Sequence, residues 1–196
     1  MRLQARHICR AALAESRLIR QSVRVVMPQQ AAGKEPDALL DHLRALTQQG
    51  AVVGAFQAAH EKFRQFHEVF LALAPAVAEY DGKAFDELSE TLDAYTILFQ
   101  EHHYAEDQYF FPALLSAEPA LAAVVELLVT QHEALASRLT DVREQMHRNR
   151  IPGDTSDRPQ RLIAALNDLH EAVDAHLALE EAETVPALST WTKWPL

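Results

Sequence analysis

The sequence has little of what β-sheets and disulfide-linked domains require. Only five glycines occur in 196 residues, and alternation of β-branched with polar residues is nearly absent. A single cysteine, Cys9, excludes an intrachain disulfide framework and suits a reducing compartment, so we expect a cytoplasmic location. Hydrophobic residues make up 48% of the chain, with many alanines and leucines. This composition favours a helical protein with one well-filled core.

Long apolar runs and clustered positive charge are also missing from most of the chain. No stretch approaches about 18 uncharged apolar residues, so we expect no transmembrane segment. The formal net charge of −10 argues against nucleic acid as a partner, because phosphate neutralisation requires clustered lysine and arginine.

Positive charge is concentrated at the N-terminus, where residues 1–27 hold six arginines against one acid, Glu15. This segment is either an amphipathic targeting or surface-binding arm, or an over-extended start with translation beginning at Met27. In either case we expect it to play no part in the chemistry. Prolines and a glycine predict a linker over residues 28–36. The chain therefore divides into a basic N-terminal extension and linker (1–36), a helical domain (37–188) and a C-terminal tail (189–196).

Hydrophobic periodicity predicts four long helices, with turn signals between them at residues 80–82, 116–119 and 152–155. Short turns between long helices favour antiparallel neighbours. The predicted fold class is therefore all-α, an antiparallel up-down-up-down four-helix bundle with an N-terminal helical extension. The tail carries Trp191 and Trp194 and is expected to pack as a cap. The four helices are expected roughly over residues 51–79, 84–115, 119–149 and 158–188.

Each predicted helix carries an inward stripe of apolar residues that step by three and four. One histidine interrupts each stripe in phase with it, and on the second and fourth helices a glutamate follows four residues later, on the same face. The stripes are Val53, Phe56, Phe63 and Phe70; Leu88, Leu92, Tyr95, Phe99 and Phe110; Val125, Leu128, Leu135, Leu139 and Val142; and Leu162, Leu166, Leu169 and Val173. The histidines and glutamates are, in chain order, His60, His102, Glu106, His132, His176 and Glu180.

The four histidines are predicted to lie at one level of the bundle. Facing residues of an antiparallel hairpin are equally far from its turn, so their midpoint falls in that turn. The midpoints between successive histidines are Asp81, Ala117 and Asp154, each within or beside a predicted turn. Three separate turns thus place the four imidazoles in one layer.

Such a layer predicts a two-metal site. Four imidazoles and two carboxylates buried without partners would cost several kcal/mol each, and divalent cations remove that cost. Two carboxylates can bridge two metals while two histidines bind each, which leaves positions for water, hydroxide or a diatomic ligand. Iron, manganese and zinc all suit these donors. Ferritin-like di-iron bundles use four carboxylates and two histidines, so the present set, with less negative charge, favours ligand binding over stabilising highly oxidised iron.

The stretch HHYAEDQYFFPAL, residues 102–114, resembles the His-His-x-x-Glu-Glu-x-x-Leu-Phe-Pro motif of the hemerythrin-like, or HHE cation-binding, family. HLALEEAETVP at residues 176–186 echoes it, and the histidines in AAHEKFR and TQHEAL sit where the family places single ligands. The resemblance covers roughly residues 50–188. It implies two iron ions as cofactor, with His60, His102, Glu106, His132, His176 and Glu180 as their ligands.

One departure from that family bears on function. Oxygen-carrying hemerythrins have a His-x-x-x-His pair on the third helix, whereas Ala136 stands four residues after His132 here. They also carry His-x-x-x-x-Asp on the fourth helix, where this chain has His-x-x-x-Glu. The resemblance therefore implies the broader HHE group, with iron binding and the sensing or handling of oxygen, nitric oxide or redox state, rather than oxygen transport.

Other polar residues lie outside the predicted ligand set. His67 is on the inward stripe, but about 10 Å from His60 along the helix axis, and is expected to support the site or fill the core. His103 and Asp107 are expected at a helix interface or in solvent, and His170 with Asp174 is expected to form a surface pair. Glu133 and Glu181 either accept hydrogen bonds from ligand histidines or are solvated. Tyr95 and Tyr109 either pack in the core or donate a hydrogen bond to a metal-bound ligand.

Two main hypotheses for function follow. The first is a cytoplasmic di-iron protein that binds, senses or handles a small oxidant or diatomic gas (oxygen, nitric oxide or peroxide) or iron itself. The second is a metal-stabilised interaction module, in which metal binding supplies folding energy only. An enzyme of peroxide or iron oxidation is a third hypothesis. No acid–base dyad or phosphate loop in the sequence supports a more elaborate reaction, and no catalytic residue is predicted.

Overall fold

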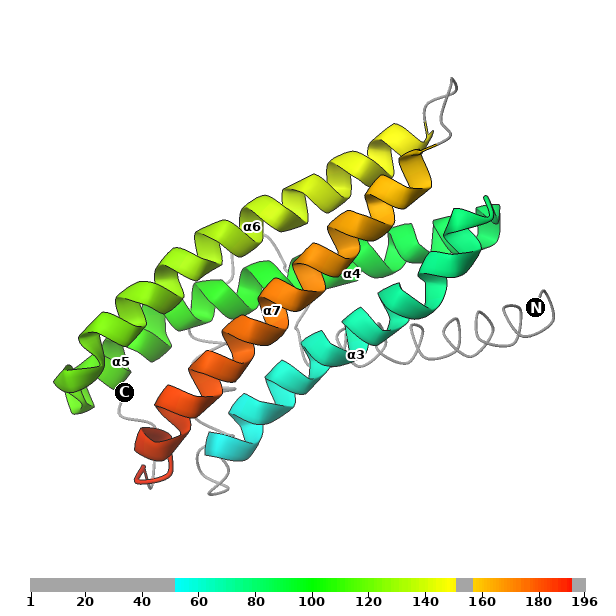
Figure 1. The fold of residues 1–196 in the computed structure, drawn as a ribbon. Helices are drawn as coiled ribbons and strands as arrows, with labels where there is room; N and C mark the ends of the chain where they lie inside the picture. Colours follow the sequence, from blue (N-terminus) through cyan, green and yellow to red (C-terminus); the bar gives the residue numbers. More distant parts are fainter. Residues whose placement is uncertain (1–51, 151–156, 192–196) are drawn as a thin grey trace, which may run out of the picture.

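The computed structural model describes residues 52–150 and 157–191, and this part of the chain is helical without any strand (Figure 1). The predicted N-terminal extension and linker, residues 1–36, lie outside the described residues, as does Trp194. The elements are α3 (Val52–Ala78), α4 (Gly82–Ala105), the π-helical turn η1 (Glu106–Phe110), α5 (Phe111–Ala117), the 3₁₀ turn η2 (Pro119–Leu121), α6 (Ala122–Arg150) and α7 (Arg158–Leu188).

These elements form an up-down-up-down bundle. In Figure 1, α3 rises, α4 with η1 and α5 returns, α6 rises again, and α7 comes back beside α3. Helix α3 packs against α4 and α7, and α6 packs against α7. The predicted all-α antiparallel four-helix architecture is therefore confirmed.

The turn between α3 and α4 shows how local sequence closes the first hairpin. Tyr80 adopts a positive φ of 60°, which reverses the chain direction after α3. The Asp81 carboxylate then accepts hydrogen bonds from the backbone N–H groups of Lys83 at 2.9 Å and Ala84 at 3.2 Å. This N-cap satisfies donors that have no partner in the first turn of α4, and it lies where the turn was predicted.

The second helix of the bundle contains a π-helical turn at the level of the histidines. The Phe111 N–H donates to the Glu106 carbonyl, five residues back, and the Glu106 N–H is shared between the carbonyls of His102 and His103. A single helix was predicted over residues 84–115, and the chain instead runs through α4, η1 and α5. The wider turn shifts the helical phase, and such turns are frequent at functional sites.

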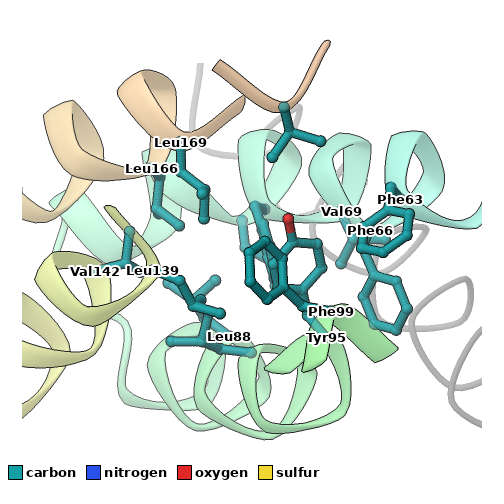
Figure 2. Close-up of a cluster of buried hydrophobic side chains, with 14 of the residues drawn as sticks. Phe63, Phe66, Val69, Leu88, Tyr95, Phe99, Leu139, Val142, Leu166 and Leu169 are labelled. Atoms are coloured by element: carbon teal, nitrogen blue, oxygen red, sulfur yellow. The ribbon is translucent and has the colours of Figure 1, made fainter. Parts of the chain in front are cut away.

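The apolar core consists of two clusters, one on each side of the histidine layer. The larger includes Phe63, Tyr95, Leu139 and Leu166, whose side chains lie in the bundle interior (Figure 2). Every residue of the predicted stripes is buried, except Val53 and Phe56, which are half-buried. The smaller cluster is formed by Val52, Phe110, Phe111, Leu114, Val125, Leu128 and Leu188, with Trp191 packed against it as predicted for the tail.

One helix is long enough and apolar enough to cross a membrane, judged by its length and composition alone. Among the described residues this is Pro119–Asn149. Its inward face carries Leu128 and His132, both buried in the bundle, whereas Leu127 on its outer face is 48% exposed. A single helix of this kind is a weak indication, and the absence of a transmembrane segment stays a prediction.

Candidate metal centre

The bundle brings all six predicted ligands to one level of its interior. His60 comes from α3, His102 from α4, Glu106 from η1 and His132 from α6. Helix α7 supplies the remaining two, His176 and Glu180. Five of these residues are at most 5% exposed, and the side chain of His102 is 11% exposed. The layer predicted from the midpoints of the turns is therefore present in the fold.

The side chains form two groups that share one carboxylate. In the first, ligand atoms of His60, His102, Glu106 and Glu180 all lie within 4.8 Å of one another. In the second, the same holds for Glu106, His132, His176 and one residue outside the predicted set, His103. Glu106 belongs to both groups, so its carboxylate would be shared between two ions if each group held one.

The individual distances place both carboxylates between the two groups. Glu106 Oε1 lies 2.8 Å from His102 Nε2, and its Oε2 lies 3.4 Å from His132 Nε2. Glu180 Oε2 lies 3.4 Å from His60 Nε2 and 3.8 Å from His176 Nε2. Each carboxylate thus faces one imidazole from each group.

The atoms that converge here have no hydrogen-bond partner. Among the described residues, the unsatisfied buried atoms include Nε2 of His60, His102, His132 and His176, and both carboxylate oxygens of Glu106 and Glu180. An unsatisfied buried polar atom costs about 1–3 kcal/mol, so this layer is unfavourable without a further partner. Imidazole nitrogen and carboxylate oxygen are donors that iron, manganese and zinc bind. The residues present therefore fit a pair of divalent cations.

For three of the four histidines, the opposite ring nitrogen has a hydrogen-bond partner outside the layer. Nδ1 of His60 donates to Glu181 Oε1 at 2.8 Å, and Nδ1 of His132 donates to Asp107 Oδ1 at 2.9 Å. Nδ1 of His176 lies 2.9 Å from Gln131 Oε1. An acceptor on Nδ1 fixes the tautomer and leaves the Nε2 lone pair free for a metal, as is typical of metal-binding histidines.

The structure decides between the two roles expected for Glu133 and Glu181, a hydrogen bond to a ligand histidine or exposure to solvent. Glu181 does accept a hydrogen bond from His60, and Arg64 Nη2 donates to the same carboxylate at 2.9 Å. Glu133 is exposed, which agrees with its solvated alternative. Asp107 contacts His132 and so supports the metal centre, a role that its position on the helix did not predict.

In the metal-free protein, the charges in this layer favour protonation of some of the candidate ligands. Burial opposes protonation of His60, but the nearby carboxylates of Glu106 and Glu180 outweigh it and raise the pKa of His60 to about 10. Burial and the neighbouring Glu106 raise the pKa of Glu180 to about 8. The pKa of Glu106 lies well below its usual range because His102 and His60 outweigh its burial. Metal binding would displace these protons, since ligands bind in their deprotonated forms.

His103 is the site residue that sequence reasoning missed. Of the two alternatives, interface or solvent, the interface is correct, because His103 is 8% exposed. Its ring stacks on His132 with centroids 3.9 Å apart and planes inclined by 8°. Burial, and then His132, lower its pKa to about 2, which leaves the imidazole neutral. The only signal in the sequence was its place directly after His102.

His67 belongs to a separate polar pair deeper in the large core cluster. Its Nε2 lies 3.0 Å from the Tyr95 hydroxyl, so Tyr95 is packed in the core and contacts His67 rather than the metal layer. His170 and Asp174 do pair, with Nε2 and Oδ2 3.7 Å apart, but both are half-buried rather than on the surface, and the His170 ring lies 5.1 Å from that of His67 between centroids. Tyr109 contacts the exposed Tyr104.

Comparison with known proteins agrees with this geometry. No curated protein and no solved structure matches the chain. A family model described as the hemerythrin HHE cation binding domain matches residues 51–188. That span contains the four-helix bundle and every residue of the two donor groups. The chain belongs to the hemerythrin HHE cation-binding domain family.

Proposed function

We propose that the protein is a non-haem di-iron protein that binds, senses or handles a small oxidant or diatomic gas. Cation binding follows from family membership and from the two donor groups. The observation that carries the proposal is the convergence of eight buried, unsatisfied donor atoms, four imidazole nitrogens and four carboxylate oxygens, on one layer of the bundle. The ligands in this proposal are His60, His102, Glu106, His132, His176 and Glu180.

The donor set supports iron together with open coordination positions. Mixed imidazole and carboxylate donors suit iron as well as manganese and zinc, and six donor residues leave two octahedral ions incompletely coordinated even when both carboxylates bridge. When bound, a pair of iron ions would supply a redox-active centre with free positions for a small ligand. The protein's part is to hold the imidazoles in the correct tautomer through Asp107, Gln131 and Glu181.

The surroundings of the layer support a ligand of only a few atoms. The ring of Phe56 lies 4.2 Å from that of His60, and Phe63 lies 4.9 Å from His102, measured between centroids. On the other side, Phe111 lies 5.7 Å from His132. These aromatic rings surround the donors with apolar surface, which excludes water and strengthens electrostatic interactions inside the layer.

The proposal is tested by loading the full chain with ferrous iron in the absence of oxygen and recording its absorbance before and after exposure to oxygen, nitric oxide or hydrogen peroxide. New charge-transfer bands with at least one of these ligands are expected. The control is the double variant His102→Ala, Glu180→Ala, which should bind no iron and give no bands. If the wild type holds two irons and responds to none of the three, the protein is a metal-stabilised interaction module instead.

A further inference from the structure

We propose that Tyr95 and His67 form a redox-active pair, in which Tyr95 gives up one electron and its phenolic proton passes to His67. The electron goes to a one-electron oxidant, such as arises when peroxide reacts with ferrous iron in the metal layer. The source of the oxidant rests on the proposed function, whereas the chemistry of the pair does not. Tyr95 and His67 belong to neither donor group, so this would be a second reactive site in the bundle.

The hydrogen bond between the two residues supplies the path for the proton. His67 Nε2 lies 3.0 Å from the Tyr95 hydroxyl, and the two residues are 1% and 0% exposed. If the imidazole were the donor, the phenolic O–H and His67 Nδ1 would both be left without a partner among the described residues. If the phenol is the donor, only Nδ1 is left. Because each buried unsatisfied group is unfavourable, the phenol donates and Nε2 accepts.

The surroundings of Tyr95 make a proton acceptor necessary for its oxidation. Burial, and then the charge of Asp174, raise the pKa of Tyr95 above its usual range, so the phenol still holds its proton when the electron leaves. A phenol that has lost an electron is a very strong acid. The O–H bond of Tyr95 therefore breaks and an N–H bond forms at His67 Nε2. That nitrogen is free to accept at neutral pH, because burial and His170 lower the pKa of His67 to about 3.

Polar groups on α7 lead from the pair toward solvent. The His67 ring lies 5.1 Å from the ring of His170 between centroids, and His170 Nε2 lies 3.7 Å from Asp174 Oδ2. Both His170 and Asp174 are half-buried. When His67 holds the extra proton, the carboxylate of Asp174 offsets part of its positive charge. The same carboxylate that opposes the phenolate thus favours the imidazolium.

Aromatic rings connect Tyr95 to the metal layer. Phe63 meets Tyr95 edge-on, with centroids 5.6 Å apart, and lies 4.9 Å from the ring of the candidate ligand His102. Phe99 lies 6.0 Å from Tyr95 and 4.0 Å from His103, in the second donor group. A single ring thus separates Tyr95 from each group, and Tyr95 is itself enclosed by apolar side chains (Figure 2). Because electron transfer slows steeply with distance, an oxidant formed in the layer is well placed to oxidise Tyr95.

The pair is tested in the full chain supplied with zinc(II), a metal that suits the donors and undergoes no redox change. The parent chain carries Tyr80→Phe, Tyr104→Phe and Tyr109→Phe, so that Tyr95 is its only tyrosine. A photo-generated ruthenium(III) tris-bipyridine complex is the oxidant, and the tyrosyl radical is followed by its absorbance. His67→Gln keeps a hydrogen-bond acceptor but removes the base. It should slow radical formation at least about 100-fold, the lower end of what a positioned base contributes.

The control is a chain that retains only Tyr104, which is 57% exposed, through Tyr80→Phe, Tyr95→Phe and Tyr109→Phe. His67→Gln should leave its radical formation unchanged. Equal rates with and without His67→Gln in the parent would mean that the pair only packs, and would overturn the proposal. Equal rates of radical formation in the parent in ordinary and heavy water would also overturn it, and this measurement needs no variant of His67.

The link to the metal layer is tested separately. The parent is loaded with iron(II) without oxygen, mixed with hydrogen peroxide and frozen rapidly for electron paramagnetic resonance. A tyrosyl signal is expected, and adding Tyr95→Phe should remove it. No such signal in protein whose absorbance does respond to peroxide would overturn the link and leave the proposed function intact. A chain that binds no iron would contradict the proposed function and the link together, while the ruthenium experiment still decides the chemistry of the pair.

Discussion

Two layers of buried histidine lie next to each other in this bundle and have opposite chemistry. His60 and His67 stand on the same stripe of α3, are 0% and 1% exposed, and look equivalent by periodicity. His67 meets the hydroxyl of Tyr95, drawn in red in Figure 2 among apolar side chains of the large core cluster. The Nε2 of His60 meets two carboxylates and has no hydrogen-bond partner among the described residues.

The electrostatic consequences differ in sign. Burial and the nearby His170 lower the pKa of His67 to about 3, so its ring stays neutral while it is hydrogen-bonded to Tyr95. Despite equal burial, the carboxylates raise the pKa of His60 to about 10. Burial on an apolar stripe therefore does not identify a metal ligand. The feature that sets His60 apart is its place in a group of four nitrogen and oxygen donors from several helices, all within 4.8 Å of one another.

The largest expected effect is the loss of both metals when the shared carboxylate is removed. Glu106→Ala should reduce cobalt(II) or iron(II) binding from two equivalents to none, because Glu106 belongs to both donor groups. Calorimetric titration measures this directly. Tyr95→Phe is the control from the other layer and should keep both equivalents. If Glu106→Ala kept two ions at wild-type affinity, the bridging assignment would be wrong.

Metal removal should produce the next largest effect. Ions that bind only the folded state stabilise it by about 4 kcal/mol each when the free concentration is about a thousand times the Kd. A chelator should therefore lower the melting temperature of the wild type substantially. It should leave the melting temperature of Glu106→Ala unchanged, and a wild-type Tm insensitive to the chelator would contradict the account.

Weakening the acceptors on Nδ1 should have a smaller effect. Asp107→Ala and Glu181→Ala each remove the partner of one ligand histidine, and the expected cost is about 10–100-fold in metal affinity. Glu133→Ala is the matched control, because Glu133 is next to His132 in sequence but exposed. Equal affinities for Asp107→Ala and Glu133→Ala would show that the hydrogen bond to His132 does not support the site.

The smallest expected effect concerns the pH dependence of stability in the His67 layer. The pKa of His67 is about 3 in the folded protein and about 6.5 when unfolded, so the unfolded chain binds more protons between these values. The stability associated with neutral His67 is thus fully present above about pH 6.5 and is lost as pH falls toward 3. In the metal-free protein, His67→Gln should make this acid slope shallower by up to about 1.4 kcal/mol per pH unit, measured by urea unfolding. An unchanged slope would contradict a neutral His67.

Much of the fold, and the convergence of the six predicted ligands on one level of the bundle, could be predicted from the sequence because helix periodicity and turn midpoints are geometric. The stripe from Phe63 to Phe70 is buried as expected, and the turn at Asp81 sets the level of His60 against His102. His103 could not be placed in the same way, because it lies about 100° around the helix from His102, and its burial against His132 depends on how α4 packs against α6.

The partners on Nδ1 were also beyond sequence reasoning. Gln131 and His176 lie on different helices, and their contact depends on the rotation of α6 against α7 and on side-chain rotamers. Periodicity determines neither of these quantities. The role of Asp107 was missed for the same reason, since its contact with His132 crosses from η1 to α6.

The most direct test of the central claim is the metal content of the full chain purified without oxygen, measured by elemental analysis against protein concentration. A di-iron layer built from four histidines and two bridging glutamates predicts two irons per chain. Fewer than one metal ion per chain, or zinc in place of iron after purification from iron-replete cells, would contradict the di-iron assignment.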